Sequence, residues 1–196
     1  MVANGAKVYI IGRRKNVLDS AVKNFGADGN IVAIEGDVTS KASLESAVNE
    51  IASKEQHVDL LINNSGISGP QYNMSGKTVE QIKEDLFKNA NFSEWDDVFR
   101  SNVSSIYFTS LAFLPLLRAG TMAEKRFSAS IINVSSVVGL SVESTKNHSY
   151  PASKAAAAHM TKLLAKSFVM TCCPALYLIL GRLQSPREWH RSWSIP

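Results

Sequence analysis

The first half of the chain alternates short apolar runs with longer amphipathic segments, and this alternation strongly constrains the fold. Runs rich in branched side chains predict buried strands at 6–11, 30–34 and 58–62. Between them, apolar residues recur at helical spacing over 16–25 and 40–54. Parallel neighbours need a long crossover connection, usually a helix, so strands separated by helices predict parallel βαβ units.

The second half is less regular. Residues 68–91 are rich in turn-forming residues and hold one short helical pattern, 78–87, which predicts a surface insertion. A long helix is expected at 95–117, followed by a strand at 129–134 and an alanine-rich helix at 150–169. Because the 95–117 segment is apolar around much of its circumference, we expect the sheet and a partner subunit to cover it on two sides.

Composition narrows the class of protein. A chain of 196 residues with 45% hydrophobic and 19% charged residues is typical of one soluble globular domain. The net charge of +4 comes from scattered residues with no long basic run, which argues against binding to nucleic acid or to a membrane surface.

Targeting and metal signals are not evident. Residues 1–15 have no apolar core typical of a signal peptide, and no uninterrupted apolar span of transmembrane length follows, so we expect no membrane association. The two cysteines, Cys172 and Cys173, are adjacent and lack metal-ligand spacing with any histidine, so we expect no metal site. Such cysteine usage suits a reducing compartment, and the cytoplasm is the default expectation.

The segment Ser149–Lys154 places Tyr150 and Lys154 one helical turn apart. A cation beside a tyrosine favours its ionised form, so such a pair can exchange a proton near neutral pH. The same spacing is also common for surface contacts on helices, and the pair alone leaves both interpretations open.

Further motifs lie around this pair in a recognisable order. Together they resemble the classical short-chain dehydrogenase/reductase family over roughly residues 3–169. The resemblance implies a Rossmann-type doubly wound parallel sheet and hydride transfer between a nicotinamide cofactor and a carbonyl or alcohol. The matching segments are Gly36-Asp37-Val38, Asn63-Asn64-Ser65-Gly66, Asn102, Ile132-Asn133-Val134-Ser135-Ser136 and Tyr150-Pro151-Ala152-Ser153-Lys154.

The resemblance implies catalytic roles for a tyrosine, a lysine and a serine. Tyr150 would donate a proton to the carbonyl oxygen, or remove one from the alcohol in the reverse reaction. Lys154 would favour the phenolate and hold the nicotinamide ribose. Ser136 would hydrogen-bond the substrate oxygen. We choose Ser136 over Ser135 because the family's serine stands three residues before a glycine, here Gly139.

A fourth catalytic candidate lies in the long predicted helix. Asn102 resembles the family's asparagine that kinks this helix and supports a water-mediated proton relay. The alternative is an exposed polar residue on a long helix, with no part in catalysis.

Cofactor contacts follow from the same resemblance. Asp37 and Val38, just past a predicted strand, resemble the pair that contacts adenine; alternatively, Asp37 caps the helix that follows. Asn64 and Gly66 would let the backbone approach the cofactor. Tyr150, together with Lys154, would also contact it.

Arg13 follows the first predicted strand, at a position where family members that use NAD commonly carry an acidic residue. A guanidinium suits the additional 2′-phosphate of NADP(H) by charge and geometry, so we expect NADP(H) rather than NAD. The alternative is that Arg13 and its neighbour Arg14 are simply solvated.

The chain also departs from the family at both ends. The family's opening strand and glycine-rich turn would precede Ala3 and are absent from the sequence, which predicts a sheet lacking a strand between 6–11 and 58–62. That turn is the family's phosphate-binding site, so cofactor affinity should fall severely. We divide the chain into a partial Rossmann domain, 1–169, and a divergent tail, 170–196, in which the last strands are missing or replaced.

An alternative for the tail is that Ala175–Leu180 (ALYLIL) forms a genuine strand and the remainder a divergent substrate loop.

Two functions are compatible with these observations. The first is an NADP(H)-dependent reductase or dehydrogenase of a small-molecule carbonyl or alcohol, most like the 3-oxoacyl-carrier-protein reductases, and a homodimer or homotetramer if complete. The second is a non-catalytic truncated product that binds a full-length subunit through its long helices.

Overall fold

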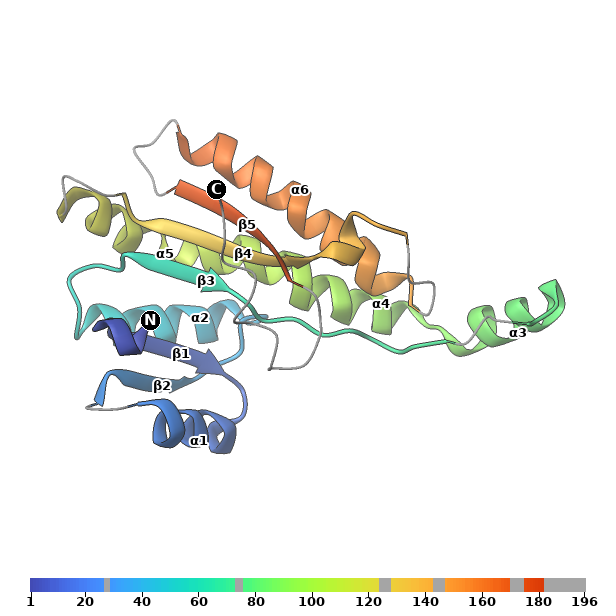
Figure 1. The fold of residues 1–196 in the computed structure, drawn as a ribbon, viewed down its shortest axis with the longest axis horizontal. Coiled ribbons are helices and arrows are strands. Elements are labelled where there is room, and N and C mark those ends of the chain that lie inside the picture. Colours follow the sequence, from blue (N-terminus) through green and yellow to red (C-terminus); the bar gives the residue numbers. More distant parts are fainter. Residues whose placement is uncertain (27–28, 73–75, 124–127, 143–146, 170–174, 182–196) are drawn as a thin grey trace.

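Figure 1 shows the computed structural model of the chain, which describes residues 1–26, 29–72, 76–123, 128–142 and 147–169, and the backbone of 175–181. Strands and helices alternate along these residues. The strands are β1 (Val8–Gly12), β2 (Ile31–Glu35), β3 (Leu60–Asn63), β4 (Ser130–Ser136) and β5 (Ala175–Gly181). The α-helices are α1 (Lys15–Phe25), α2 (Lys41–Ala52), α3 (Val79–Asn89), α4 (Phe92–Phe99), α5 (Ser105–Ala123) and α6 (Ser149–Val169).

All the described strand pairings are parallel, as the alternation of strands and helices predicted. β1 pairs with β2, with Val8 opposite Ile31. β4 lies between β3 and β5, with Ser130 opposite both Leu60 and Ala175. The predicted α/β class with a parallel sheet is therefore confirmed.

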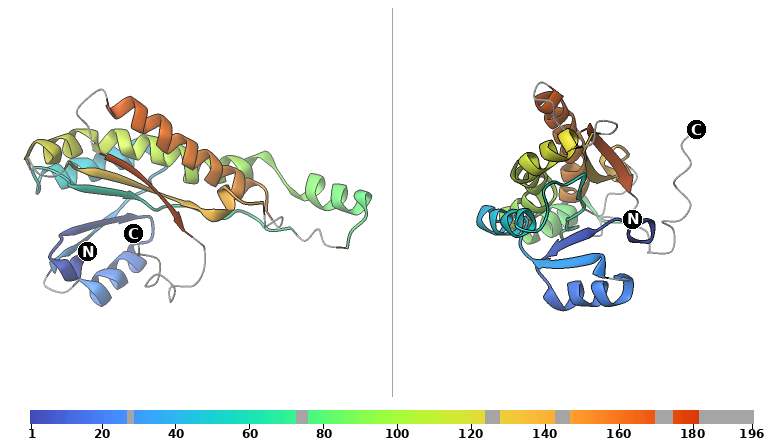
Figure 2. Two further views of the ribbon diagram at one scale, coloured as in Figure 1. Left: turned by 45° about the horizontal axis from the view of Figure 1, so that its top comes forward. Right: turned by 90° about the vertical axis from the view of Figure 1, so that its left-hand side faces the viewer.

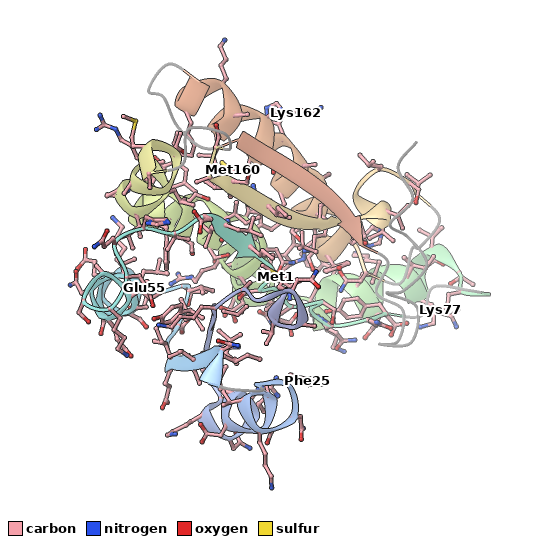
Figure 3. The ribbon with its side chains drawn as sticks, turned by 60° about the vertical axis from the view of Figure 1, so that its left-hand side comes forward. Met1, Phe25, Glu55, Lys77, Met160 and Lys162 are labelled. Carbon is pink, nitrogen blue, oxygen red and sulfur yellow. The ribbon has the colours of Figure 1, made fainter. Side chains whose placement is uncertain are left out.

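The strands divide into two sheets, one with the order β1-β2 and the other with the order β3-β4-β5. Among the described strands, β1 pairs only with β2 and β3 only with β4. This interruption lies where the sequence predicted that a strand would be lacking. In Figure 3, Phe25 at the end of α1 and Lys162 of α6 lie at opposite ends of the molecule.

β5 continues the larger sheet beyond Val169. Its backbone pairs with β4 from Ala175 to Gly181. The alternative that 175–180 forms a strand is therefore confirmed. Residues 182–196 lie outside the described ones, so the division into a domain and a divergent tail stays a prediction.

Local sequence explains where the helices begin. Ser40 caps α2, its side chain accepting a hydrogen bond from the Ser43 N–H. Thr78 and Gln81 form a reciprocal capping box at the start of α3. Asn91 caps α4 by a single bond, its side chain accepting a hydrogen bond from the Glu94 N–H. These caps set the observed starts within a few residues of the predicted ones.

The helix predicted at 95–117 is present but its predicted bounds are wrong, and it is interrupted at Asn102, where the resemblance implied a kink. The helical run begins at Phe92, and a π-helical turn, η3 (Arg100–Ser104), separates α4 from α5. The extra residue in such a turn re-aims the side chains that follow, and π-turns recur at functional sites. This turn contains Asn102, which is fully buried.

The core lies where α5 and α6 pack on β3 and β4. Figure 2 shows α2, α5 and α6 gathered on one side of the larger sheet. Ile131, the second residue of β4, and Leu117 on α5 are both 0% exposed. The sheet therefore covers one side of α5, as predicted.

The helical run Phe92–Ala123 is, by length and composition alone, apolar enough to cross a membrane; its most apolar window has a mean hydropathy of 1.3 and is 39% buried in the protein. The core helix of a soluble protein passes the same test, so this is weak evidence. The expectation of no membrane association stays a prediction.

The predicted insertion forms α3, which extends away from the other elements (Figure 1). None of its residues is buried, and Val79 and Phe87 are 77% and 84% exposed. An isolated helix of this length is marginal in water, so its capping box carries much of its stability.

Truncating the buried side chain of Ile131 on β4 should test the packing of the core. We expect Ile131→Ala to lower the free energy of unfolding by about 2–5 kcal/mol, because the cavity left behind adds to the lost transfer energy. Urea denaturation measures this change. Val142→Ala, at a site that is 94% exposed, is the control and should change stability by less than about 0.5 kcal/mol. Equal effects of the two variants would contradict the described core.

Candidate active site

The predicted catalytic residues meet where β4 ends and α6 begins. After Ser136 the chain makes a short 3₁₀ turn, η4 (Val137–Gly139), and Gly139 lies against α6. A Cβ atom at Gly139 would lie 2.7 Å from the carbonyl carbon of Lys154 and 2.8 Å from the Ala155 nitrogen. Only glycine allows η4 to approach α6 this closely.

Lys154 is buried rather than part of a surface pair. The residue is 5% exposed, and its Nζ donates a hydrogen bond to the Val134 carbonyl oxygen at 2.9 Å. The same Nζ lies 5.7 Å from the centre of the Tyr150 ring. The surface-contact interpretation of this pair is therefore wrong, and the lysine reaches inward to the end of β4.

Burial controls the acid–base character of the pair. It raises the pKa of Tyr150, and a hydrogen bond with the Ser136 hydroxyl lowers that pKa by a smaller amount. Burial also lowers the pKa of Lys154. The expected net lowering of the Tyr150 pKa by the Lys154 charge is not found in this structure. Desolvation instead keeps the phenol protonated, as a proton donor requires.

The two adjacent serines of β4 have different partners. The Ser135 hydroxyl donates to the Lys154 carbonyl oxygen at 2.7 Å and so joins β4 to α6. The Ser136 side chain instead faces Tyr150 and lowers the pKa of its phenol. This arrangement supports the choice of Ser136 as the catalytic candidate.

Asn102 connects three parts of the site and is 0% exposed, so the alternative of an exposed helix residue is wrong. Its Oδ1 accepts from the Ile67 N–H at 2.8 Å, and its Nδ2 donates to the Ile67 carbonyl oxygen at 2.9 Å. Nδ2 also donates to the Ser153 hydroxyl at 2.9 Å, one residue before Lys154. Asn102 thereby ties the loop after β3 to α6.

The loop after β3 separates core residues from candidate cofactor residues. Asn63 points inward and donates to the Asn133 side chain at 2.8 Å, whereas Asn64 and Gly66 are exposed. A Cβ atom at Gly66 would lie 2.8 Å from the Asn102 Oδ1. Glycine is therefore required for this exposed backbone to reach Asn102.

Asp37 lies at the end of β2, where its carboxylate accepts from the Thr39 N–H at 2.8 Å and from the Thr39 hydroxyl at 2.7 Å. These hydrogen bonds lower the pKa of Asp37, and the charges of Arg13 and Arg100 lower it further. Because Ser40 caps α2, the alternative that Asp37 is the helix cap is wrong.

A cavity of about 460 Å³ lies beside Val38, between the start of α2 and the η3 turn. Its lining includes Lys41 and Arg100, and the Lys41 ammonium lies 4.8 Å from the centre of the Phe108 ring. Arg13 is exposed at the end of β1. Positive side chains therefore flank Asp37 from two elements.

Sequence reasoning missed Arg100 and Asn147. Arg100 had no signal beyond standing two residues before Asn102. Asn147 is buried, and its side chain accepts from the Tyr150 N–H at 3.0 Å. An asparagine just before a helix is a capping signal that could have identified it.

Metal ligation has no support in the described parts of the chain, which contain no group of three or more His, Cys, Asp or Glu side chains able to hold an ion. Cys172 and Cys173 lie outside the described residues.

Comparison with known proteins matches most of the chain to one family. The family described as "short chain dehydrogenase" matches residues 1–173. A relative from Diaporthe leptostromiformis, "Short-chain dehydrogenase/reductase PhomF", is 41% identical over 165 residues, covering 83% of this chain and 56% of the relative. The chain thus spans a little over half the length of that relative.

Two proteins from Pseudomonas aeruginosa extend the comparison. The "Rhamnolipids biosynthesis 3-oxoacyl-[acyl-carrier-protein] reductase" is 30% identical over 186 residues, covering 95% of this chain and 66% of the relative. The solved structure "Pseudomonas aeruginosa RhlG/NADP active-site complex" has a TM-score of 0.76 and 27% identity, covering 93% of this chain and 65% of that chain.

Removing the Asn102 amide should destabilise the protein. In Asn102→Leu the Ile67 N–H and carbonyl lose their buried partner, so we expect a loss of about 2–4 kcal/mol in the free energy of unfolding. Chemical denaturation measures the loss. The matched control is Asn49→Leu at an exposed position of α2, where we expect little change. A comparable loss in both variants would contradict the assigned network.

Proposed function

Because this chain belongs to the short-chain dehydrogenase/reductase family, we propose that it transfers hydride between NADP(H) and a carbonyl or secondary alcohol. The observation that carries the proposal is the meeting of Ser136, Tyr150 and Lys154 at one edge of the larger sheet. Ligands of open parallel sheets bind at this edge, outside the carboxyl ends of the strands.

Proton transfer is assigned to Tyr150. In the reductive direction its hydroxyl proton passes to the carbonyl oxygen as the C–O double bond becomes a single bond, and NADPH, when bound, supplies the hydride to the carbonyl carbon. The pKa of Tyr150, raised by burial, keeps the proton on the phenol until the oxygen gains negative charge. Solvent then reprotonates the phenolate.

The neighbouring side chains stabilise the charge that develops. Ser136 lies near enough to Tyr150 to lower its pKa, so its hydroxyl is placed to donate to the same substrate oxygen. Lys154 lies close enough to stabilise the phenolate once it forms. Asn102 holds the loop and α6 around this group, where it would support a water-mediated relay of the proton.

The residues present fit a dinucleotide with an additional phosphate. Exposed Asn64 and Gly66 offer backbone approach, and Lys154 would hold the nicotinamide ribose. Asp37 and Val38 would contact the adenine, while Arg13 would pair with the 2′-phosphate. The P. aeruginosa structure named as an NADP complex supports this choice over NAD.

We assign a 3-oxoacyl thioester as the substrate class, because one relative is named a 3-oxoacyl-carrier-protein reductase. We also assign a homo-oligomeric state and a cytoplasmic location. Exposed apolar side chains on the two long helices support self-association: Tyr107 and Leu111 on α5 are 39% and 37% exposed, and Leu163 on α6 is 49% exposed.

The proton-donor assignment is tested by Tyr150→Phe. We expect the oxidation of NADPH by an acetoacetyl thioester to slow by at least about 100-fold, because the ring remains but its proton is lost. Fluorescence titration should show NADPH affinity nearly unchanged. Tyr9→Phe on β1, where the lost hydroxyl donates to the Glu55 side chain, is the control and should retain full turnover. Retained activity in Tyr150→Phe would refute the assignment.

The cofactor assignment is tested by Arg13→Ala. We expect the Kd for NADPH to rise by about 10- to 100-fold and that for NADH to stay unchanged, because only NADPH carries the 2′-phosphate. Arg14→Ala removes a charge from the next position and should have a smaller effect. A wild-type protein that binds no NADPH up to about millimolar concentration, or roughly −4 kcal/mol, would overturn the proposed function.

A further inference from the structure

Asn147 makes three hydrogen bonds at the start of α6 and is 9% exposed. Its Oδ1 accepts from the Ser149 hydroxyl at 2.9 Å and from the Tyr150 N–H at 3.0 Å. Its Nδ2 donates to the Ser68 carbonyl oxygen. One side chain thus joins the first turn of α6 to the loop that follows β3.

The bond to Tyr150 satisfies a group that the helix itself leaves unpaired. The first four N–H groups of an α-helix have no intrahelical acceptor, and Tyr150 is the second residue of α6. Without the Asn147 acceptor the first turn would fray more readily. Such fraying would move the Tyr150 ring relative to Ser136, which lies on the rigid strand β4.

The bond to Ser68 fixes the loop that follows β3. Gly69 has a φ of +68°, and a Cβ atom there would lie 2.8 Å from the Val98 Cγ2 and 3.3 Å from the Ser149 Oγ. The loop is therefore packed tightly against the start of α6. Asn102 holds this loop at Ile67, and Asn147 holds it at the next residue.

We propose that Asn147 is a positioning residue for proton transfer. It holds the start of α6, and with it Tyr150, at a fixed position relative to Ser136 and to the loop at Ser68. Asn102 and Asn147 act as two amide clamps on consecutive residues of that loop, and only Asn147 also binds the backbone of Tyr150. The inference rests on the proposed function, because its catalytic consequence is the alignment of the Tyr150 hydroxyl.

Asn147→Ala is the principal test. We expect kcat with NADPH and an acetoacetyl thioester to fall by about tenfold or more, while the Kd for NADPH changes by less than about threefold, because Asn64 and Lys154 are untouched. Hydrogen exchange of the Tyr150 amide, followed by NMR, should accelerate by about tenfold. The Ile67 amide, which Asn102 holds, is the internal reference and should keep most of its protection.

Two further variants separate positioning from general stability. Asn147→Asp keeps an oxygen acceptor for the Tyr150 N–H but loses the donor to Ser68, so it should retain protection of the Tyr150 amide. Asn91→Ala removes a similar cap from α4, where Oδ1 accepts from the Glu94 N–H at 2.9 Å. We expect it to lower stability and leave kcat unchanged.

The outcomes distinguish this inference from the proposed function. An inactive wild-type protein would overturn the proposed function. The exchange rate of the Tyr150 amide would still test the hydrogen bond that this amide donates to Asn147. An unchanged exchange rate in Asn147→Ala would overturn the inference. A faster exchange with unchanged kcat in an active protein would also overturn it, because Asn147 would then be merely structural.

Discussion

The arrangement of the site depends on the buried amide of Asn102. Its hydrogen bonds reach the backbone of Ile67 in one direction and the Ser153 hydroxyl in the other. A fully buried amide in an apolar helix is costly unless its donor and acceptor groups are satisfied, and here the η3 turn directs it toward partners. The same side chain explains why Gly66 must lack a Cβ atom. One polar residue thus specifies the helix geometry, the path of the loop and the placement of α6.

Desolvation is the main influence on the pKa values of Tyr150 and Lys154. Burial favours the neutral form of both groups, raising the pKa of Tyr150 and lowering that of Lys154. The protein therefore keeps the phenol protonated while placing a cation near it. The Val134 carbonyl oxygen compensates part of the cost of burying the ammonium. Such opposed requirements are common where a side chain must hold a proton in one step and release it in the next.

Much of the fold could be predicted from the sequence, because hydrophobic periodicity reports which face of each element is buried. The strand and helix pattern in the first half is such a case, whereas the grouping of Ser136, Tyr150 and Lys154 was implied by the family resemblance. The break at η3 is not visible in the hydrophobic pattern, since a π-turn leaves that pattern largely intact, and only the resemblance at Asn102 pointed to it. The capping role of Asn147 had a local signal, but its bond to Ser68, 79 positions away in the chain, could not be predicted. Periodicity also cannot distinguish a buried strand from an irregular apolar tail, so 175–180 remained open until its pairing with β4 was seen.

The register of the larger sheet has a consequence for how the chain folds. Asn63 of β3 meets Asn133 of β4 across 70 positions of sequence, and the intervening residues include the whole of α3, α4 and α5. Closing a loop of that length costs conformational entropy before any strand pairing repays it. Parallel sheets with such distant contacts fold slowly compared with proteins rich in local contacts. The carboxyl edge of the larger sheet, where Ser136 lies, is therefore completed only when strands far apart in the chain have come together.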